Sequence, residues 1–492
     1  MKTQRFDRRS FLKTTGYGVS AFYIAKTSWA QNSPGDTIRA GVIGFRSRGR
    51  SHISSLSNLK HKGVSITALC DVDAKVLDSG VKSLEKKKAK VKGYSDLRKM
   101  LEDKDLDVIS IATPNHWHSL AAILAIQAGK DVYVEKPVSH NVWEGRQLVN
   151  AARKYKRIVQ TGTQSRSSDG LQEAVKWVQA GNLGKIEIAR GLCYKNRPSI
   201  GLTKGPHPVP ENIDWDLWCG PAPLKPPTRN SKKNGPVHYD WHWTWDYGNG
   251  DLGNQGIHQM DIARWFMGEM QLSPRVWSLG GRVGYEDDGE TPNSQIVYHD
   301  YKNAPLIFEV RGLPQSKTEN GRPVYMGASV GVIIHCEGGN VSIPNYSGAN
   351  VLDKNGKEIK KFTSKTQGND AHFDNFIAAV KSRKPEDLNA DILEGHLSSA
   401  LCHTGNISYR LGATANPEEL KAFAKSEKGG EESLGRLIDH LDKNGVNLAK
   451  EKLTLGPALK MNPGTEKFIG NPAADKLLTR EYRKPFVVPK IV

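Results

Sequence analysis

The stretch TIRAGVIGFRSRG, residues 37–49, decides the fold of this chain. Its first seven residues form an apolar run that predicts a buried β-strand. Gly44 and Gly49 follow this strand and precede a helical segment, which is the setting of a nucleotide-binding turn. Such a turn needs glycine for its sharp bend and for close backbone approach to a pyrophosphate. Arg46 occupies the middle position, where glycine is usual, so its side chain either swings outward or pairs with the phosphate.

Strand and helix patterns alternate onward from this turn. Apolar runs predict further strands at residues 64–70, 107–112 and 131–134. Residues 118–128 are helical in pattern, and a glycine ends that helix. The alternation predicts a doubly wound parallel sheet, an α/β Rossmann domain spanning residues 36–162.

The pattern changes beyond this first domain. Residues 184–198 and 275–345 contain longer β-rich runs, and residues 370–411 look helical. We therefore predict a substrate-binding domain at residues 163–411, of the α+β class with an open, largely antiparallel sheet. An open sheet of this kind usually packs against a copy of itself, which predicts a homodimer or homotetramer. The polar, lysine-rich residues 412–492 are interpreted as a C-terminal extension that wraps around the body.

The first thirty residues look like an export signal. The segment Asp7-Arg8-Arg9-Ser10-Phe11-Leu12-Lys13 resembles the twin-arginine motif, with Asp where Ser or Thr is usual. A mildly apolar stretch follows, and Ser28-Trp29-Ala30 then offers the small residues that signal peptidase reads. Residues 1–30 are therefore predicted to direct the protein to the periplasm, and a disordered or surface amphipathic N-terminus is the alternative. No other segment approaches the roughly 18 apolar residues of a membrane span, so no membrane insertion of the mature form is expected.

The charge and the cysteines argue against some classes of function. The formal charge of +18 includes five net positive charges from residues 1–30, and the other basic residues are spread along the chain. Because no nucleic-acid-binding module is recognisable, a solvated basic surface is favoured over nucleic-acid binding. The five cysteines are far apart without zinc-type spacing, which predicts neither a metal site nor a disulfide framework, although one pair could form in an oxidising compartment.

Asp71 indicates which dinucleotide the turn would bind. It ends the predicted second strand, 22 residues after Gly49, where an acid can accept both ribose hydroxyls of NAD. A 2′-phosphate would meet its negative charge, which favours NAD over NADP, although Arg46 and Arg48 keep NADP possible. The alternative is an aspartate that only caps a turn or a helix.

Two motifs follow strands at the carboxyl edge of the predicted sheet, where α/β proteins bind ligands. They are Ala112-Thr113-Pro114-Asn115-His116-Trp117-His118 and Glu135-Lys136-Pro137. Together with Gly41-Val42-Ile43-Gly44, and with the spacing between these pieces, they resemble the Gfo/Idh/MocA oxidoreductase family over roughly residues 37–410. The combined prediction for the cofactor site is Gly44, Phe45, Arg46, Arg48, Gly49, Asp71, Thr113, Pro114, Asn115, His118, Glu135, Lys136 and Gln164.

The resemblance also implies catalytic residues. In that family the lysine of Glu-Lys-Pro lies beside the nicotinamide and hydrogen-bonds the reacting hydroxyl, and this is Lys136 here. A buried ammonium near a forming alkoxide lowers the barrier to proton loss. Residues 250–261 resemble the segment that points at the substrate, in which His258 matches the catalytic histidine and Asn254 stands where many members have Asp. Asparagine can orient His258 or bond the substrate, but it carries no charge to raise the basicity of the imidazole. A surface lysine and a histidine satisfied in the core are the alternatives.

Aromatic and polar residues suggest a sugar-like substrate. Trp241 and Trp243 belong to a run of alternating aromatics, which predicts a strand with one set of rings on one face, and flat rings can stack on the C–H faces of sugars. A packed β-hairpin is the alternative. Arg166 lies at the predicted domain junction and Tyr194 ends a predicted strand, so both are further candidates for substrate contact.

The leading hypothesis is an NAD(P)-dependent oxidoreductase that transfers hydride between a hydroxyl-bearing carbon of a sugar, glycoside or cyclitol and a tightly bound cofactor. Free NAD is scarce outside the cytoplasm, so an exported enzyme would keep its cofactor and regenerate it with a second substrate. One alternative is a redox-neutral glycoside hydrolase or lyase acting by transient sugar oxidation, since no standalone carboxylate pair suggests ordinary hydrolysis. A non-catalytic nucleotide- or sugar-binding protein is the other, motivated by Arg46 and Asn254.

Overall fold

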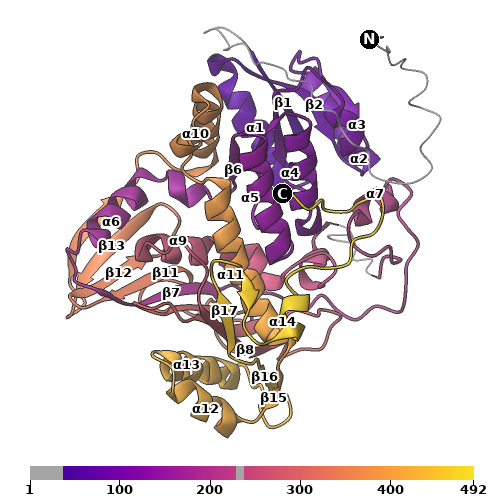
Figure 1. Ribbon diagram of the computed structural model, residues 1–492. Coiled ribbons are helices and arrows are strands. Elements are labelled where there is room, and N and C mark those ends of the chain that lie inside the picture. The colour runs from indigo at the N-terminus through magenta and orange to yellow at the C-terminus, as the bar shows by residue number, and fades with distance from the viewer. Residues whose placement is uncertain (1–36, 229–237, 492) are drawn as a thin grey trace, which may run out of the picture. The chain divides into compact units, whose positions relative to one another are not determined.

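Two β-sheets organise the described part of the chain, residues 37–228 and 238–491 of the computed structural model (Figure 1). The predicted export signal at residues 1–30 lies outside the described residues, so export stays a prediction. Among the residues that are described, no helix is both long and apolar enough to cross a membrane.

The first sheet is parallel and has the strand order β3-β2-β1-β4-β5-β6, which is that of a doubly wound dinucleotide-binding fold. Its strands are β1 (Ile38–Ile43), β2 (Val64–Cys70), β3 (Lys92–Tyr94), β4 (Val108–Ile111), β5 (Asp131–Val134) and β6 (Val159–Thr161). The helical segments between them are α1 (Arg48–Asn58), η2 (Leu59–Lys62), α2 (Ala74–Glu85), α3 (Leu97–Leu101), α4 (Asn115–Gln127) and α5 (Val142–Lys154). The predicted Rossmann fold is therefore confirmed.

Helices cover both faces of this sheet. Every residue of β4 and β5 is buried, as expected for a parallel sheet packed on both sides. One face packs against α4 and α5, and the other packs against α1 and α10 (Gly368–Ser382), where Phe373 stacks on Tyr133 with ring centroids 4.1 Å apart. Because α10 lies between β14 and β15 in the chain, a helix from the second half completes the core of the first sheet (Figure 1).

The second sheet continues the fold with strands β7 to β18. Its main path has the order β14-β13-β12-β11-β7-β10-β9-β8-β16-β15, and β17 also pairs with β8. Its pairings are antiparallel except that β10 runs parallel to β7, which confirms the predicted, largely antiparallel sheet. The bounds are β7 (Ile186–Tyr194), β8 (Arg275–Gly281), β9 (Ser294–His299), β10 (Leu306–Arg311), β11 (Val330–Cys336), β12 (Gly339–Ile343), β13 (Gly348–Asp353), β14 (Glu358–Thr363), β15 (Ala413–Ala415), β16 (Leu453–Leu455), β17 (Leu459–Asn462) and β18 (Lys467–Phe468).

Helices of the second half pack mainly on one face of this sheet. The largest apolar cluster lies between the sheet and α6, α9 and α11, and it includes Leu171, Phe266, Phe308 and Leu401. The helical segments are η3 (Gln164–Ser167), α6 (Asp169–Gln179), α7 (Trp215–Cys219), η4 (Asp240–Trp243), η5 (Leu252–Gly256), α9 (Ile257–Met267), η6 (Pro385–Asp387), α11 (Ile392–Arg410), α12 (Pro417–Lys425), α13 (Gly430–Lys443) and α14 (Pro472–Lys476).

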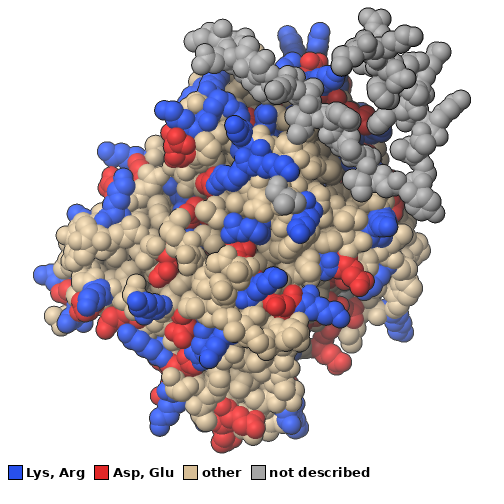
Figure 2. Space-filling view, in the orientation of Figure 1, with Lys and Arg blue, Asp and Glu red and all other residues tan. Residues whose placement is uncertain are grey.

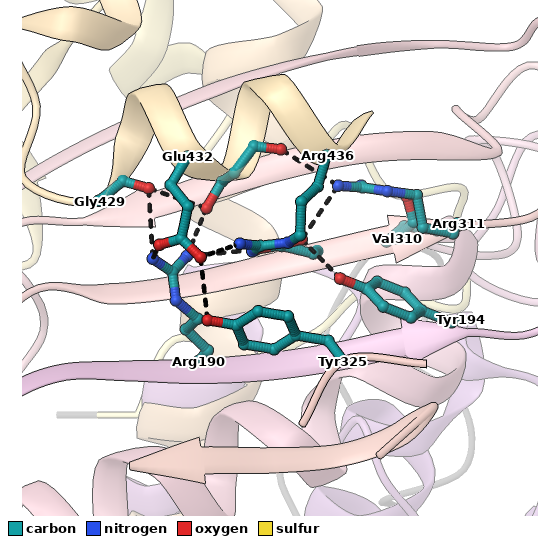
Figure 3. A network of polar contacts seen from close by, with 10 residues as sticks. Arg190, Tyr194, Val310, Arg311, Tyr325, Gly429, Glu432 and Arg436 are labelled. Carbon is teal, nitrogen blue, oxygen red and sulfur yellow. Dashed lines mark hydrogen bonds and ion pairs between the residues drawn. The ribbon is translucent and has the colours of Figure 1, made fainter. Parts of the chain in front are cut away.

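The opposite face carries a buried charge network that α13 covers (Figure 3). Glu309 on β10 is fully buried and accepts hydrogen bonds from Arg190 at 3.2 Å, Arg311 at 3.0 Å and Tyr194 at 2.7 Å. Arg436 of α13 also pairs with Glu309. The chain itself therefore occupies part of the sheet face that we expected a partner copy to cover, and an oligomer stays a prediction.

The rest of the C-terminal extension contacts both domains. After α13, β16 and β17 pair with β8 of the second sheet. The final segment then runs back to the Rossmann helices, where Phe486, Val488 and Ile491 join the core around α4 and α5 (Figure 1). The backbone N–H of Ile491 donates to Gln147 at 2.6 Å, which attaches the tail to α5.

Charged residues are scattered over the surface. On the face in Figure 2, Lys and Arg side chains are mixed with Asp and Glu side chains and with large neutral areas. All five cysteines are free and buried, so the pair that we left open is not formed. Within residues 37–228 and 238–491, no three His, Cys, Asp or Glu side chains are grouped as metal ligands would be.

Candidate active site

A cavity of about 340 Å³ lies at the carboxyl edge of the parallel sheet. Eleven of the predicted cofactor residues line it: Gly44, Phe45, Arg46, Arg48, Asp71, Thr113, Pro114, Asn115, His118, Glu135 and Lys136. The second half of the chain contributes Ile213, Leu217, Trp218, His238, Tyr239, Trp241, His242 and Asn254. Folding thus brings the strand-end motifs together with a wall of aromatic and polar side chains from the second domain.

The glycine turn has the geometry that its sequence predicts. Gly44 has a φ of +74°, and a Cβ there would lie 2.9 Å from the backbone nitrogen of Thr113. A Cβ at Gly49 would overlap the carbonyl oxygen of Gly44, so both positions require glycine. Phe45 is buried in the core of the nucleotide-binding domain, whereas Arg46 is exposed and lines the cavity. The pairing of Arg46 with a phosphate stays a prediction.

Asp71 stabilises the glycine turn through backbone hydrogen bonds. Its two carboxylate oxygens accept hydrogen bonds from the backbone N–H groups of Phe45 and Asp73, each at 3.0 Å. Burial raises the pKa of Asp71 to about 6, even though the two backbone donors favour the charged form. The turn-capping alternative is thus realised, and Asp71 also lines the cavity where it can meet a ribose.

The loop after β4 is fastened to the loop after β5. The ring nitrogens of His118 lie 2.7 Å from the carbonyl oxygen of Thr113 and 2.6 Å from that of Pro137. Asn115 donates across the domain junction to Asn249 at 3.3 Å. His118 is therefore a positioning residue that fixes both strand-end motifs.

Glu135 is the centre of a buried polar cluster in the wall of the cavity. One carboxylate oxygen accepts hydrogen bonds from Arg48 at 2.7 Å and Gln164 at 3.3 Å, and it lies 3.2 Å from Nε2 of His52. Burial alone would raise the pKa of Glu135, but Arg48 and His52 bring it well below its usual value. Arg48 and Gln164 thus act as hydrogen-bond donors to Glu135, and Gln164 does not line the cavity.

Lys136 reaches across to the second domain. Its side chain is buried against the cavity wall, and Nζ donates to the backbone carbonyl of Asn254 at 2.6 Å. Burial lowers the pKa of Lys136 to about 8, and the neighbouring Glu135 carboxylate limits that fall. A lysine that changes protonation near neutral pH at a cavity wall is typical of a catalytic site.

Asn254 and His258 follow in sequence, but only Asn254 lines the cavity. Asn254 belongs to the π-helical turn η5, and His258 lies in the first turn of α9 beside Tyr346, with ring centroids 5.4 Å apart. Turns of this rare type often occur at functional sites. Burial, followed by the charge of Lys136, lowers the pKa of His258 to about 3, so its imidazole is neutral. No signal in the sequence indicated this π-helical turn.

The predicted aromatic strand is wrong in its secondary structure. Residues 240–243 form the 3-10 helix η4, so the rings do not alternate between two faces. Trp241 lines the cavity, but Trp243 is buried beneath Arg197, whose guanidinium lies 5.1 Å from the ring centroid. Trp241 therefore remains a candidate for substrate contact and Trp243 does not.

The substrate contacts predicted for Arg166 and Tyr194 are also wrong. Arg166 is buried in ion pairs with Asp261 and Glu394, each at 2.9 Å, and does not line the cavity. Tyr194 donates to Glu309 on the far face of the second sheet (Figure 3). Both residues were predicted to contact the substrate because of the strand ends near them. Their side chains instead bind partners that are distant in the sequence.

Three histidines of the site were missed, and one of them, His238, lines the cavity beside Asp73. His52 lies on α1, where its position on a helix gives no signal of the contact with Glu135. His242 lines the cavity, stacks on Trp241 with centroids 3.6 Å apart, and has Nδ1 2.6 Å from the carbonyl oxygen of Tyr239. The aromatic run around His242 was the available signal, and it was interpreted as sugar stacking or as a packed β-hairpin.

The residues of the cavity fit a dinucleotide. The glycine turn leaves space that any Cβ would fill, and Asp71 supplies an acceptor beside it. The hydroxyl oxygen of Thr113 is buried and has no hydrogen-bond partner among the residues that the structure describes, which leaves it available to a bound group.

Two family profiles match the chain. Residues 38–163 match GFO_IDH_MocA, described as an oxidoreductase family with an NAD-binding Rossmann fold. Residues 172–318 match GFO_IDH_MocA_C2, the C-terminal alpha/beta domain of an oxidoreductase family. Together these matches span more than half of the chain.

Curated relatives resemble shorter stretches. An inositol 2-dehydrogenase of Salmonella paratyphi B is 29% identical over 178 residues, which are 36% of this chain and 52% of that enzyme. A glycosyl hydrolase family 109 protein of Shewanella pealeana is 32% identical over 171 residues, which are 30% of this chain and 37% of that protein. The chain thus spans about half or less of the length of the curated relatives it matches.

Solved structures share the fold. Levoglucosan dehydrogenase in complex with NADH and levoglucosan has 17% identity and a TM-score of 0.54, over 75% of this chain and 95% of that one. The WlbA dehydrogenase from Bordetella pertussis, in complex with NADH and UDP-GlcNAcA, has 19% identity and a TM-score of 0.54, over 74% and 94%.

Proposed function

Because this chain belongs to the Gfo/Idh/MocA oxidoreductase family, we propose that it transfers hydride between a hydroxyl-bearing carbon of a sugar, glycoside or cyclitol and a tightly bound NAD. The observation that carries this proposal is Lys136, which bonds the Asn254 carbonyl in the same cavity that the glycine turn lines. Relatives named as inositol and levoglucosan dehydrogenases support a polyhydroxylated substrate.

The cavity has a place for each part of NAD. The turn at residues 44–48 would hold the phosphates, Asp71 a ribose, and Thr113 a further polar group. When bound, the nicotinamide supplies the acceptor for the hydride. NADP is disfavoured because the charge of Asp71 would oppose a 2′-phosphate, although the exposed Arg46 keeps it a candidate.

Lys136 is suited to move the hydroxyl proton. With a pKa of about 8, its side chain passes between ammonium and amine around neutral pH. The amine accepts the O–H proton when the substrate is oxidised, and the ammonium returns it to the oxygen when a carbonyl is reduced. The carbonyl of Asn254 keeps Nζ in place through both directions.

His258 is the predicted second group of this reaction. Its neutral imidazole does not line the cavity, and its low pKa makes it a weaker base than Lys136. The side chain of Asn254, which lines the cavity, supplies an uncharged hydrogen-bonding partner. We therefore assign the main proton transfer to Lys136 and a positioning role to Asn254 and His258.

A redox-neutral glycoside cleavage is the second candidate. The relative named as a glycosyl hydrolase family 109 protein favours it, at 32% identity. This reaction would oxidise the sugar, release the aglycone and then reduce the sugar again. A purely nucleotide-binding role is less well supported, because it does not explain a buried lysine with a pKa near neutrality.

The test begins with mass spectrometry of the cofactor released from purified protein. A panel of sugars, glycosides and cyclitols is then screened for cofactor reduction by absorbance, and for aglycone release. Reduction without aglycone supports the dehydrogenase, and aglycone release without net reduction supports the redox-neutral reaction. Protein that contains no nicotinamide cofactor and turns over none of these compounds would contradict both.

We also propose that residues 1–30 are a twin-arginine signal and that the mature protein is periplasmic. A homo-oligomer would have to use sheet strands beyond those that α13 covers. N-terminal sequencing of the periplasmic fraction and light scattering of the purified protein test these two points.

A further inference from the structure

A long loop of the second domain crosses to the edge of the nucleotide-binding domain. The loop, residues 199–228, is anchored at one end by backbone hydrogen bonds from Ile200 to Asp287 and from Thr203 to Asp288, both at 2.8 Å. Its middle part, at Asn212 and Ile213, packs against the segment that joins β2 to α2. The loop therefore connects the two domains, and its residues Ile213, Leu217 and Trp218 line the cavity.

The contact is made at Asp73. The side-chain amide of Asn212 donates to Asp73 at 2.7 Å, and the ring of His238 lies 3.1 Å from the other carboxylate oxygen. Ile213 pairs with Asp73 as an antiparallel β-bridge. The backbone N–H of Ala74 also donates to the carbonyl of Asn212 at 2.8 Å. Asp73 is 5% exposed, so these bonds lie away from bulk water, where hydrogen bonds to a charged group are strongest.

This contact lies on the nucleotide side of the cavity. Asp73 follows Asp71 by two residues, and Asp71 accepts the backbone N–H of Asp73. Asp71 and Asp73 line the cavity together with Ile213, Trp218 and His238, which contact this segment from the loop and the residues after it. A dinucleotide with its ribose at Asp71 would thus lie under the loop.

We propose that Asp73, Asn212, Ile213 and His238 form a clasp that prevents the cofactor from leaving between turnovers. The inference rests on the proposed function and adds how the cofactor is retained. A retained cofactor that has taken hydride from one hydroxyl-bearing carbon must return it in the same cavity. The acceptor is then a carbonyl compound, either a second sugar or the oxidised substrate itself, and the proton given up to Lys136 returns to the new hydroxyl.

The first experiment measures cofactor exchange and not catalysis. Protein loaded with isotopically labelled NAD is mixed with excess unlabelled NAD, and the label that stays bound is followed by rapid gel filtration. We expect slow loss from the wild type and loss about tenfold faster from Asn212→Ala, which removes one hydrogen bond to a charged acceptor. Leu202→Ala is the matched control, because this side chain is on the same loop, is 64% exposed, and should leave the exchange rate unchanged.

The second experiment closes the clasp covalently. Asp73 and Ile213 are direct partners in an antiparallel bridge, a spacing at which a disulfide can form. In Asp73→Cys/Ile213→Cys the five natural cysteines are buried and should not compete. We expect oxidised protein to retain NAD loaded beforehand and to exclude NAD added afterwards, and reduction to restore exchange.

The results separate the clasp from the function on which it rests. The clasp is overturned if the wild type and Asn212→Ala exchange NAD equally fast, or if the oxidised double variant takes up NAD as readily as the reduced one. Protein that binds no nicotinamide nucleotide in any of these states would overturn the proposed function and the clasp together.

Discussion

Glu135 and Glu309 are both buried carboxylates with cationic neighbours, yet they have different roles in the molecule. Glu135 follows a strand of the parallel sheet and lines a cavity, with Arg48 and His52 beside it. Glu309 is within strand β10 of the second sheet and pairs with Arg436 of α13. Figure 3 shows Arg436 among the polar residues of this cluster. The pKa of each is lowered by its cations against the effect of burial.

The two carboxylates differ in role because the groups beside them differ. Glu135 precedes Lys136, whose ammonium faces the cavity and has a pKa of about 8. The charge of Glu135 therefore sets the protonation of a group that a substrate can reach. The described partners of Glu309 are three arginines and Tyr194, and none of them lines the cavity, so we expect its charge to contribute to stability and not to catalysis. A buried ion cluster indicates a functional site only when it opens on a cavity.

The largest expected effect concerns the reactive member of the Glu135 cluster. Lys136→Met removes the group that moves the proton, so kcat/KM should fall by about a thousandfold or more, while NAD remains bound. Steady-state kinetics and the nicotinamide content of the purified variant measure the two quantities. If the variant kept more than a tenth of the activity, Lys136 would not be the proton-transfer group.

The next effect should be on stability at the other glutamate. Glu309→Gln leaves three buried or half-buried arginines without their shared anion, which should lower the free energy of unfolding by about 3–5 kcal/mol. Activity measured below the unfolding temperature should be unchanged. Glu432→Gln is the control, because this carboxylate is half exposed and its loss should cost less than about 1 kcal/mol. Equal destabilisation by the two variants would contradict the comparison.

The same contrast predicts a dependence of stability on pH. The pKa of Glu309 is lowered from 4.5 to about 2, so its contribution is complete above pH 4.5 and is lost as the pH falls towards 2. Urea unfolding midpoints of the wild type should drop through this window more steeply than those of Glu309→Gln. Parallel curves for the two proteins would show that Glu309 does not titrate as inferred.

A smaller effect is expected when the charge of Glu135 is removed. Because this carboxylate raises the pKa of Lys136, Glu135→Gln should move that pKa below about 8. The acid limb of the kcat/KM profile, where Lys136 gains a proton, should then shift to lower pH. Gln164→Leu removes a neutral donor and keeps the charge, so its profile should not shift. A shift to higher pH in Glu135→Gln would reverse the assignment.

The smallest effect tests Tyr194, which the sequence placed at the substrate. Tyr194→Phe removes one hydrogen bond to Glu309 and should lower the free energy of unfolding by about 1–2 kcal/mol with KM unchanged. Chemical denaturation and kinetics on the best substrate check both parts. A raised KM with unchanged stability would restore Tyr194 to the substrate site.

Much of the nucleotide site could be predicted because its rules are local. The bend at Gly44, the packing at Gly49 and the strand-end position of Lys136 all depend on neighbours in sequence, which a pattern contains. The wrong predictions, by contrast, concern side chains that bind residues distant in the sequence. Arg166 pairs with Asp261, 95 residues away, and Tyr194 bonds Glu309, 115 residues away, so neither partner was visible from the strand end it follows.

By itself, the sequence determined the doubly wound sheet, the largely antiparallel second sheet and the identity of the cofactor turn, because periodicity and glycine positions act within a few residues. Only the tertiary structure decided that Lys136 bonds the carbonyl of Asn254, that α13 closes over Glu309, and that the loop at residues 199–228 reaches Asp73. These contacts join segments more than a hundred residues apart, and such pairings depend on how the finished elements pack against one another.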